Sequence, residues 1–288
     1  MSEEKKWVLV TGARSGIGKA CTEYLSTHGF NVYAGVRKDA DIEELGRLQN
    51  VVAVKLDVTS DDDVQDVVKT IESRETGLYG LVNNAGISFA EPLMDVSIAE
   101  LQNILDVNLL GVHRVTRAMF PFIFKSNGRV VMMSSSNGRI AFPFEGPYTM
   151  AKFGLEGYSD TFHQEMLPFG VKIILVEPGP IKTSIWDKGL ELLENLKNQD
   201  HSVEILAQVC MTAGPVVIKN NKRTGKEPVE VAKAVHEALT ADRPRRRYPV
   251  MDKEWQFRLA QTHPGLVDKA VLKLFNGAIK RLKDAGKA

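Results

Sequence analysis

Two rhythms of apolar and polar positions alternate along this chain. Short, nearly continuous apolar runs are typical of strands buried on both faces of a sheet, and they predict strands at residues 7–11, 31–36, 51–55, 80–83, 129–134 and 171–177. Longer amphipathic stretches predict helices at residues 16–28, 41–47, 61–75, 98–120 and 148–167. Pro121 and Gly170 mark the expected ends of the two longest helices. This alternation favours an α/β fold in which helices cover both faces of one doubly wound parallel sheet.

The rhythm is lost between residues 178 and 228, where glycine and proline recur. A connection of this length is usually functional or mobile, so residues 185–228 are interpreted as an inserted lid over a binding site. The later expected elements are a helix at residues 228–239, a strand at residues 247–250, and an amphipathic basic helix at residues 267–285 within a helical C-terminal extension over residues 252–288. The whole chain, residues 1–288, is therefore expected to form a single domain with these two additions.

Composition excludes several classes of protein. Hydrophobic residues make up 43% of the 288 residues and charged residues 25%, as in an ordinary soluble protein, and a net charge of +1 favours neither nucleic acid nor an anionic membrane. Cys21 and Cys210 lie far apart, and no residues share metal-ligand spacing, so neither a disulfide framework nor a metal is predicted. No apolar run resembles a signal peptide or a spanning helix, and the protein is predicted to be cytoplasmic.

A glycine-rich turn lies between the first strand and the first helix. Gly12, Gly16 and Gly18 would let the backbone approach a pyrophosphate and present the helix amides to it. Their spacing differs from the common dinucleotide fingerprint, and taken alone the segment could be a plain tight turn.

A candidate proton-transfer pair lies further along the chain. Tyr148 and Lys152 stand four residues apart, and on a helix they would share one face. A lysine ammonium beside a phenol would lower the tyrosine pKa towards working pH, as a general acid or base requires. Ser135 precedes Tyr148 by thirteen residues.

Together these motifs make the chain resemble the short-chain dehydrogenase/reductase family, from residue 7 to about residue 184. The resemblance is carried by Thr11–Gly18, Asp57, Asn83–Gly86, Asn108, Ser135, Tyr148, Lys152 and Pro178–Thr183. Within the family, the segments 80–88, 152–160 and 176–179 are similar to the branch of retinol, 17-beta-hydroxysteroid and 3-hydroxybutyrate dehydrogenases. The resemblance implies a Rossmann-type fold and hydride transfer between a nicotinamide dinucleotide and an alcohol or ketone.

The resemblance also implies four catalytic roles. Tyr148 would exchange a proton with the substrate oxygen, and Lys152 would lower its pKa and bind the nicotinamide ribose. Ser135 would hydrogen-bond the substrate oxygen as charge develops there. Asn108 would support a water that connects Lys152 with solvent. The plainer alternatives are that Asn108 bonds a neighbouring main chain and that Lys152 is a surface cation.

The cofactor-binding set follows from the same resemblance. It comprises Gly12, Arg14, Ser15, Gly16, Ile17, Gly18, Arg37, Asp57, Val58, Asn84, Ala85, Gly86, Tyr148, Lys152, Pro178, Gly179, Ile181 and Thr183. In the family, Asp57 contacts the adenine and Asn84 lies beside the adenosine ribose, while Ile181 and Thr183 hold the nicotinamide side. Asp57 could equally be a strand-end turn residue. Asn83 and Asn84 could be loop residues that bond backbone, and because family members use this segment for both purposes, the two interpretations coexist.

Charge at the end of the second strand favours NADP over NAD. A carboxylate there would accept the ribose 2′-hydroxyl and repel a 2′-phosphate. Val36 occupies the position at which NAD-preferring relatives keep aspartate, and Arg37 follows it. Arg14 could supply a second cation to the phosphate. NADP is therefore predicted, with NAD as the alternative, and Arg37 could also be a solvated loop charge.

The predicted substrate pocket is apolar and aromatic. It is expected to be lined by Phe89, Phe142, Phe144, Trp186, Asn137, Ser135 and Tyr148. Such pockets suit bulky lipophilic ligands, so a ketone or secondary alcohol on a steroid- or retinoid-like skeleton is predicted. A hydroxy-acid substrate would need a cation for its carboxylate. Arg139 is the obvious nearby candidate, and it could equally face solvent.

Several partners and functions stay open at this point. The resemblance implies a homodimer or homotetramer formed through the helices at residues 98–120 and 148–167. The basic helix at residues 267–285 could rest on a membrane surface, cover a neighbouring subunit or pack on its own domain, and the last is favoured. The predicted function is an NADP-dependent oxidoreductase. The alternatives are an NAD-dependent dehydrogenase of retinol or 3-hydroxybutyrate type and a non-catalytic dinucleotide-sensing protein.

Overall fold

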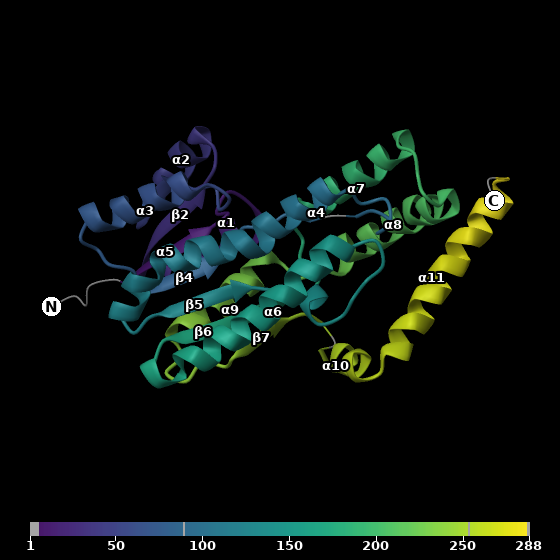
Figure 1. Ribbon diagram of the computed structural model, residues 1–288. Helices are drawn as coiled ribbons and strands as arrows, with labels where there is room; N and C mark the ends of the chain where they lie inside the picture. Colours follow the sequence, from purple (N-terminus) through teal and green to yellow (C-terminus); the bar gives the residue numbers. More distant parts are fainter. Residues whose placement is uncertain (1–5, 89, 253, 287–288) are drawn as a thin grey trace.

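One seven-stranded parallel sheet organises the protein (Figure 1). The computed structural model describes residues 6–88, 90–252 and 254–286. The strands are β1 (Lys6–Thr11), β2 (Phe30–Val36), β3 (Val51–Lys55), β4 (Gly80–Asn83), β5 (Arg129–Met133), β6 (Lys172–Pro178) and β7 (Arg247–Val250). Their order is β3-β2-β1-β4-β5-β6-β7, so the chain reverses direction across the sheet between β1 and β4. Ligands of open α/β sheets bind at such a switch point, outside the carboxyl ends of the strands.

Helices cover both faces of the sheet, as predicted. Along β1, Val8 and Val10 pack on one face and Leu9 on the other, and all three side chains are fully buried. The first face is covered by α1 (Gly16–Thr27), α2 (Asp39–Gly46) and α9 (Pro228–Thr240). The second is covered by α3 (Asp61–Ser73), α5 (Gly111–Lys125) and α6 (Gly146–Met166). All seven predicted strands are present, with ends within one residue of those predicted.

The single helix predicted at residues 98–120 differs from the observed structure in two respects, so that prediction is wrong in its detail. It is divided into α4 (Ile98–Leu105), a π-helical turn (Asp106–Leu110) and α5, and α5 runs through Pro121 to Lys125. Ile123 is fully buried against the sheet, and Phe120 and Phe122 pack beside it. Burial of these side chains outweighs the cost of the proline, whose missing N–H would otherwise end the helix.

The segment without strand–helix rhythm forms two helices, α7 (Ile185–Asn195) and α8 (Glu204–Thr224). They enclose a small core of their own, made by Leu193, Leu196, Cys210 and Ile218. Pro215 lies inside α8. The sequence pattern concealed α8 because its apolar positions are divided between two partners, with Cys210 and Ile218 packed towards α7 and Val209 and Ala213 packed towards the C-terminal helix.

The C-terminal extension consists of α10 (Glu254–Thr262) and α11 (Pro264–Asp284). In Figure 1, α11 lies at the end of the molecule opposite the N-terminus, alongside α8. Ala278 and Leu282 of α11 are buried against Val209 and Ala213 of α8, which agrees with packing on its own domain. Among the described residues, no helix is both long and apolar enough to span a lipid bilayer.

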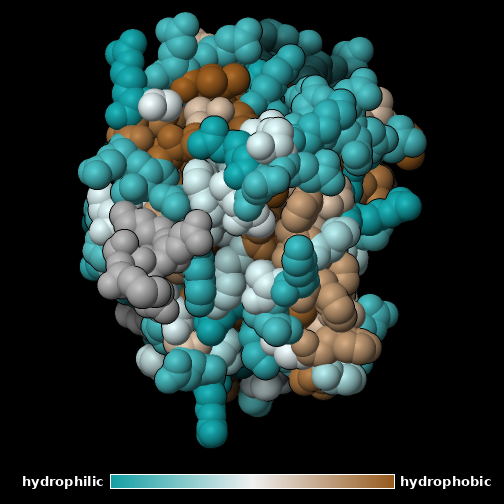
Figure 2. Space-filling model, turned by 90° about the vertical axis from the view of Figure 1, so that its left-hand side faces the viewer, coloured by the Kyte–Doolittle hydropathy of each residue, from teal (hydrophilic) through white to brown (hydrophobic). Residues whose placement is uncertain are grey.

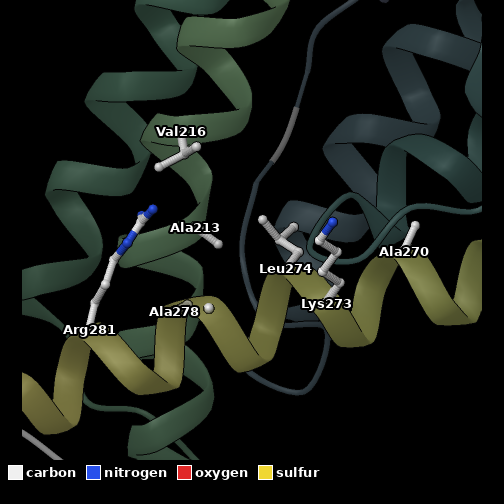
Figure 3. Close-up of a pocket in the computed structure, with 8 residues that line it drawn as sticks. Ala213, Val216, Ala270, Lys273, Leu274, Ala278 and Arg281 are labelled. Carbon is white, nitrogen blue, oxygen red and sulfur yellow. The ribbon is translucent and has the colours of Figure 1, made fainter.

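A pocket of about 310 Å³ lies between α8 and α11 (Figure 3). Ala213 and Val216 of α8 face it from one side, and Lys273, Leu274 and Arg281 of α11 from the other. None of the predicted site residues lines this pocket. On the face of the molecule shown in Figure 2, hydrophilic side chains predominate and apolar ones gather in separate patches.

Gly18→Ala should destabilise the fold by roughly 1–3 kcal/mol, the usual cost of overpacking. A Cβ at Gly18 would lie 2.2 Å from the carbonyl oxygen of Gly12 and 2.5 Å from Nδ2 of Asn84. Gly277→Ala is the matched control, because a Cβ there meets nothing within 4 Å and alanine favours the α11 helix by about 0.5–1 kcal/mol. Urea denaturation of both variants measures the difference, and equal stabilities would contradict the proposed close contact.

Candidate active site

Three loops meet where β1, β4 and β6 end. Gly12 has a left-handed backbone (φ 66°), and a Cβ on it would lie 2.9 Å from Cα of Ala85 in the loop after β4. A Cβ on Gly16 would lie 3.0 Å from Cγ2 of Thr183 in the loop after β6. Any other side chain at these two glycines would fill the space at the switch point. The predicted glycine turn, the Asn84–Gly86 loop and Thr183 are therefore brought together.

The amino end of α1 is open to an anion. Ser15 precedes α1, and its side chain accepts no capping hydrogen bond from the helix. The first amides of a helix lack intrahelical partners and carry the positive end of its dipole. With Ile17 in the first turn and Gly18 packed against Gly12, the turn fits the pyrophosphate of a dinucleotide.

Asn84 bonds backbone. Its Nδ2 donates to the carbonyl oxygen of Thr11 at 2.9 Å, and the amides of Asn84 and Ala85 both donate to Oγ1 of Thr11, each at 2.9 Å. The expected backbone-bonding role of Asn84 is therefore present, and it fixes the loop against the glycine turn. A Cβ on Gly86 would lie 2.8 Å from Oδ1 of Asn108, so this loop also passes close to the π-helical turn.

The predicted adenosine end carries two exposed arginines. Nη1 of Arg14 lies 3.1 Å from Oδ1 of Asp41, and Nη1 of Arg37 lies 3.9 Å from Oδ2 of Asp57. Asp57 also accepts hydrogen bonds from the amide and hydroxyl of Thr59, at 2.9 and 2.7 Å. Burial alone would raise the pKa of Asp57, but the Thr59 bonds and the Arg37 charge hold it below its ordinary value.

Val58 is buried next to this end, and its carbonyl oxygen accepts a hydrogen bond from Arg114 at 2.7 Å. On the nicotinamide side, Pro178 ends β6 and the amide of Gly179 donates to the carbonyl oxygen of Val250 at 3.1 Å. Ile181 is buried, and its carbonyl oxygen accepts from Nε1 of Trp186 at 2.7 Å. The loop after β6 is therefore fixed by backbone bonds beside the lid.

Asn108 lies in the π-helical turn and is fully buried. Its Oδ1 accepts from the amide of Ile87 and its Nδ2 donates to the carbonyl oxygen of the same residue, both at 2.9 Å. The side chain thus bonds a neighbouring main chain, as the plainer alternative proposed. Such π-turns are frequent at functional sites. The amphipathic pattern of residues 98–120 gives no indication of this one.

Ser135 and Asn137 form a small hydrogen-bonded unit after β5. The amide of Asn137 donates to Oγ of Ser135 at 3.1 Å. The side-chain Nδ2 of Asn137 donates to the carboxyl of Glu145, just before α6, and lies 3.4 Å from Oγ1 of Thr149. Ser135 and Asn137 are both buried, and both of their segments converge on the start of α6.

Tyr148 and Lys152 share one face of α6, as predicted. Nζ of Lys152 lies 5.5 Å from the centroid of the Tyr148 ring and donates to the carbonyl oxygen of Met133, at the end of β5, at 2.8 Å. Lys152 is buried, which excludes the surface-cation alternative. Burial lowers its pKa to about 8, against the opposing charge of Glu156.

The expected lowering of the Tyr148 pKa is wrong. Burial raises the pKa of Tyr148 to about 12; the Ser135 side chain lowers it and the charge of Glu145 raises it further. The Lys152 ammonium is directed to the Met133 carbonyl, so it does not offset burial of the phenol. Tyr148 is therefore protonated at neutral pH, the form that donates a proton.

The structure brings only some of the aromatic residues predicted to line the substrate pocket close to one another. Phe144 and Trp186 pack against the core of the lid helices, whereas Phe142 is exposed and Phe89 lies outside the described residues. The ring of Phe144 stacks on Phe275 of α11 with centroids 5.3 Å apart. The sequence did not connect α11 with this loop, because the two residues are far apart in the chain.

Arg139 is not free to bind a substrate carboxylate. Its Nη1 pairs with Oε1 of Glu177 at 2.9 Å and its Nη2 donates to Oε1 of Gln261 in α10 at 3.0 Å. The same Oε1 of Glu177 accepts from Nε of Arg247 at 3.0 Å.

Comparison with known proteins agrees with this geometry. The model of the short chain dehydrogenase family matches residues 6–191. The chain belongs to the short-chain dehydrogenase family. It is 34% identical to D-beta-hydroxybutyrate dehydrogenase, mitochondrial, of Rattus norvegicus, over 92% of this chain and 83% of that protein. It is also 34% identical to retinol dehydrogenase 5 of Mus musculus, over 92% of this chain and 87% of that protein.

A solved short-chain dehydrogenase from Streptomyces avermitilis has the same fold, with a TM-score of 0.75, 24% identity and coverage of 100% of this chain and 99% of that one. As a short-chain dehydrogenase, the protein is an NAD(P)-dependent oxidoreductase. The space that Gly12 and Gly16 leave, the open start of α1 and the buried Lys152 ammonium fit a nicotinamide dinucleotide. In the part of the chain that the structure describes, no three His, Cys, Asp or Glu residues lie together as metal ligands would.

In this dehydrogenase, a buried clasp fastens the lid. Nδ1 of His201, in the turn between α7 and α8, lies 3.1 Å from Oδ2 of Asp95, and its Nε2 lies 2.8 Å from the carbonyl oxygen of Leu196. The amide of Ser202 donates to Oδ1 of Asp95 at 2.8 Å. No local sequence signal links Asp95 to His201. Burial alone would lower the pKa of His201, but the Leu196 and Asp95 bonds and the Asp95 charge raise it above 6.5.

His201→Gln should remove a pH-dependent stabilisation of the lid. Because the pKa of His201 is raised in the folded protein, its contribution is complete below about pH 6.5 and is lost as the pH rises through the raised pKa. Wild type should therefore exceed the variant by about 1 kcal/mol at pH 6 and by less at pH 9, measured by chemical denaturation. His263→Gln, at an exposed histidine, serves as the control; a difference that grows with pH would contradict the clasp.

Proposed function

We propose that this dehydrogenase uses NADP to interconvert a ketone and a secondary alcohol on a lipophilic, steroid- or retinoid-like skeleton. The observation that carries the proposal is the pair of a half-buried Tyr148 and a buried Lys152 on one face of α6, with the Ser135 side chain hydrogen-bonded to the phenol at the end of the sheet where the glycine turn lies. A merely dinucleotide-sensing protein would have no need for a protonated phenol, a buried ammonium and a serine at one place.

In the reductive direction, Tyr148 donates its phenolic proton to the substrate carbonyl oxygen as that oxygen gains charge. Ser135 hydrogen-bonds the same oxygen and stabilises the developing negative charge. Lys152 would hold the nicotinamide ribose, and its ammonium, once turned from the Met133 carbonyl towards the ring, would stabilise the phenolate that remains. The bound nicotinamide supplies the hydride, or accepts it when the alcohol is oxidised. The glycine turn would hold the pyrophosphate.

Arginine at the adenosine end supports NADP. Val36 is buried at the end of β2, so no carboxylate stands there to repel a 2′-phosphate. The side chains of Arg14 and Arg37 are more than half exposed, and their pairs with Asp41 and Asp57 are of the solvent-screened kind that contributes little. Either guanidinium can therefore turn to a phosphate, which it binds in bidentate fashion.

The similarity to D-beta-hydroxybutyrate dehydrogenase and to retinol dehydrogenase 5 keeps an NAD-dependent enzyme of either type as the second candidate. The bonds of Arg139 to Glu177 and Gln261 count against a hydroxy-acid substrate, because this arginine is not free to bind the substrate carboxylate. Phe144 and Trp186, packed on the lid core, support a lipophilic substrate instead.

We also propose that the protein is a cytoplasmic homodimer or homotetramer. Exposed large apolar side chains follow the outer faces of the π-helical turn, α5 and α6, namely Leu110, Phe124, Met150 and Phe153. Exposed apolar side chains on neighbouring helices support an interface there, and two-fold packing of the long helices would bury them. Contact of α11 with a membrane surface is the less favoured use of that helix, because its Ala278 and Leu282 already pack on α8.

Tyr148→Phe should lower kcat by about a thousandfold, in the range attributed to general acid–base catalysis. NADPH binding, followed by nucleotide fluorescence, should change less than about twofold, because the ring is retained. Tyr158→Phe is the matched control on the same helix, where the hydroxyl lies 3.2 Å from His113. Turnover that survives in Tyr148→Phe would refute the acid role.

Arg37→Asp should weaken NADPH binding by about tenfold or more and leave NADH binding unchanged or tighter, since a carboxylate repels the 2′-phosphate and accepts a 2′-hydroxyl. Titration calorimetry with both cofactors measures the change. Arg223→Asp, at an exposed arginine near the end of α8, controls for the loss of positive charge. Equal effects on the two cofactors would contradict the NADP assignment.

A further inference from the structure

The residue two positions before the start of α6, Phe144, has a strained backbone conformation. Phe144 has a left-handed backbone (φ 68°), which a bulky side chain adopts only where its surroundings hold it. Two contacts hold it here. Its carbonyl oxygen accepts from the amide of Glu91 at 2.8 Å, and its ring stacks on Phe275 with an interplanar angle of 8°. The residue that follows this constrained position is Glu145.

Glu145 belongs to the same hydrogen-bonded unit as the catalytic serine. Oε2 of Glu145 accepts from Nδ2 of Asn137, and the amide of Asn137 donates to Oγ of Ser135. Glu145 also lies one helical turn before Tyr148, and its charge acts on that phenol. The carboxyl is therefore placed beside both groups that contact the substrate oxygen.

Among the described residues, no basic side chain pairs with the Glu145 carboxyl, and no group donates a hydrogen bond to its Oε1. Burial raises its pKa, while the Asn137 bond lowers it. A second acidic side chain, that of Glu91, is also buried, and its backbone amide is the donor to the Phe144 carbonyl oxygen; burial raises the pKa of Glu91, and the charge of His201 lowers it. Glu145 lies beside Ser135 and Tyr148 without a cationic partner within the described ranges, so its ionised carboxylate opposes the approach of a substrate anion.

We propose that Glu145 determines substrate specificity, its carboxyl rejecting carboxylate substrates and selecting neutral or cationic ketones and alcohols that can donate a hydrogen bond to Oε1. This rests on the proposed function, and it narrows the substrate class of that site. The rat relative is named for D-beta-hydroxybutyrate, an anion. In this chain Arg139 is held by Glu177 and offers such an anion no free cation, while Glu145 repels it.

A matched pair of substrates tests the proposal. Methyl 3-oxodecanoate and the 3-oxodecanoate anion share one reacting ketone and one lipophilic chain, and they differ in charge beside it. With NADPH, the wild type should reduce the ester with a kcat/KM at least about tenfold above that of the anion, because like charges brought together disfavour the anion. Glu145→Gln, which keeps the shape and an acceptor for Asn137, should shrink this ratio by about tenfold.

Glu165→Gln is the matched control, since Glu165 is an exposed acid on the same helix, and its ratio should equal that of the wild type. An unchanged ester-to-anion ratio in Glu145→Gln, or a wild type that prefers the anion, would overturn the role of Glu145 and leave the proposed function standing. A wild type that binds NADPH but reduces neither the ester nor any lipophilic ketone would instead overturn the proposed function, and this inference with it.

A measurement on the wild type alone covers the case in which Glu145→Gln fails to fold. Decylammonium and decanoate are inhibitors of equal chain length and opposite charge. Decylammonium should compete with the ketone with an inhibition constant about tenfold or more below that of decanoate. Equal inhibition, or tighter binding of decanoate, would overturn the proposal.

Discussion

The hydrogen bond from Lys152 to the carbonyl oxygen of Met133 is the constraint on which the site depends. It joins the middle of α6 to the end of β5 through a buried ammonium, at 2.8 Å. Burying a charge is costly unless it is bonded, so α6 cannot rotate or slide without losing this contact. Tyr148, one turn earlier, and Glu156, one turn later, are thereby fixed on the same helix face.

The face of α6 continues into a buried network of charges. Glu156 accepts from the hydroxyl of Ser134 at 2.5 Å and from Nη2 of Arg247 at 2.8 Å. Arg247 also pairs with Glu177, which in turn holds Arg139. A broken buried pair leaves an uncompensated charge, so these partners are strongly coupled. The network joins β6, β7 and the loop after β5, and it removes from the site the cation that a hydroxy acid would need.

Helices α7, α8 and α11, which lie outside the layers of the sheet, hold segments that lead to the predicted site. The His201–Asp95 clasp fastens the turn between α7 and α8, and α11 supports the strained Phe144 through Phe275. The loop that carries Glu145 and leads to Tyr148 is thus held by helices outside the sheet. The catalytic candidates lie where the strands of the sheet end, whereas the loop that carries Glu145 is held by these added helices.

Local pattern was sufficient for much of this protein. Period-two burial in β1 and the spacings of Gly12, Tyr148 and Lys152 are properties of short segments, so the sheet, its covering helices, the cofactor turn and the Tyr–Lys pair were predictable from sequence. The direction of the Tyr148 pKa, the engagement of Arg139 and the placement of Glu145 were decided only by the tertiary structure. Each depends on burial or on partners brought in by distant segments, and electrostatic effects are set by surroundings in space, not by neighbours in the chain.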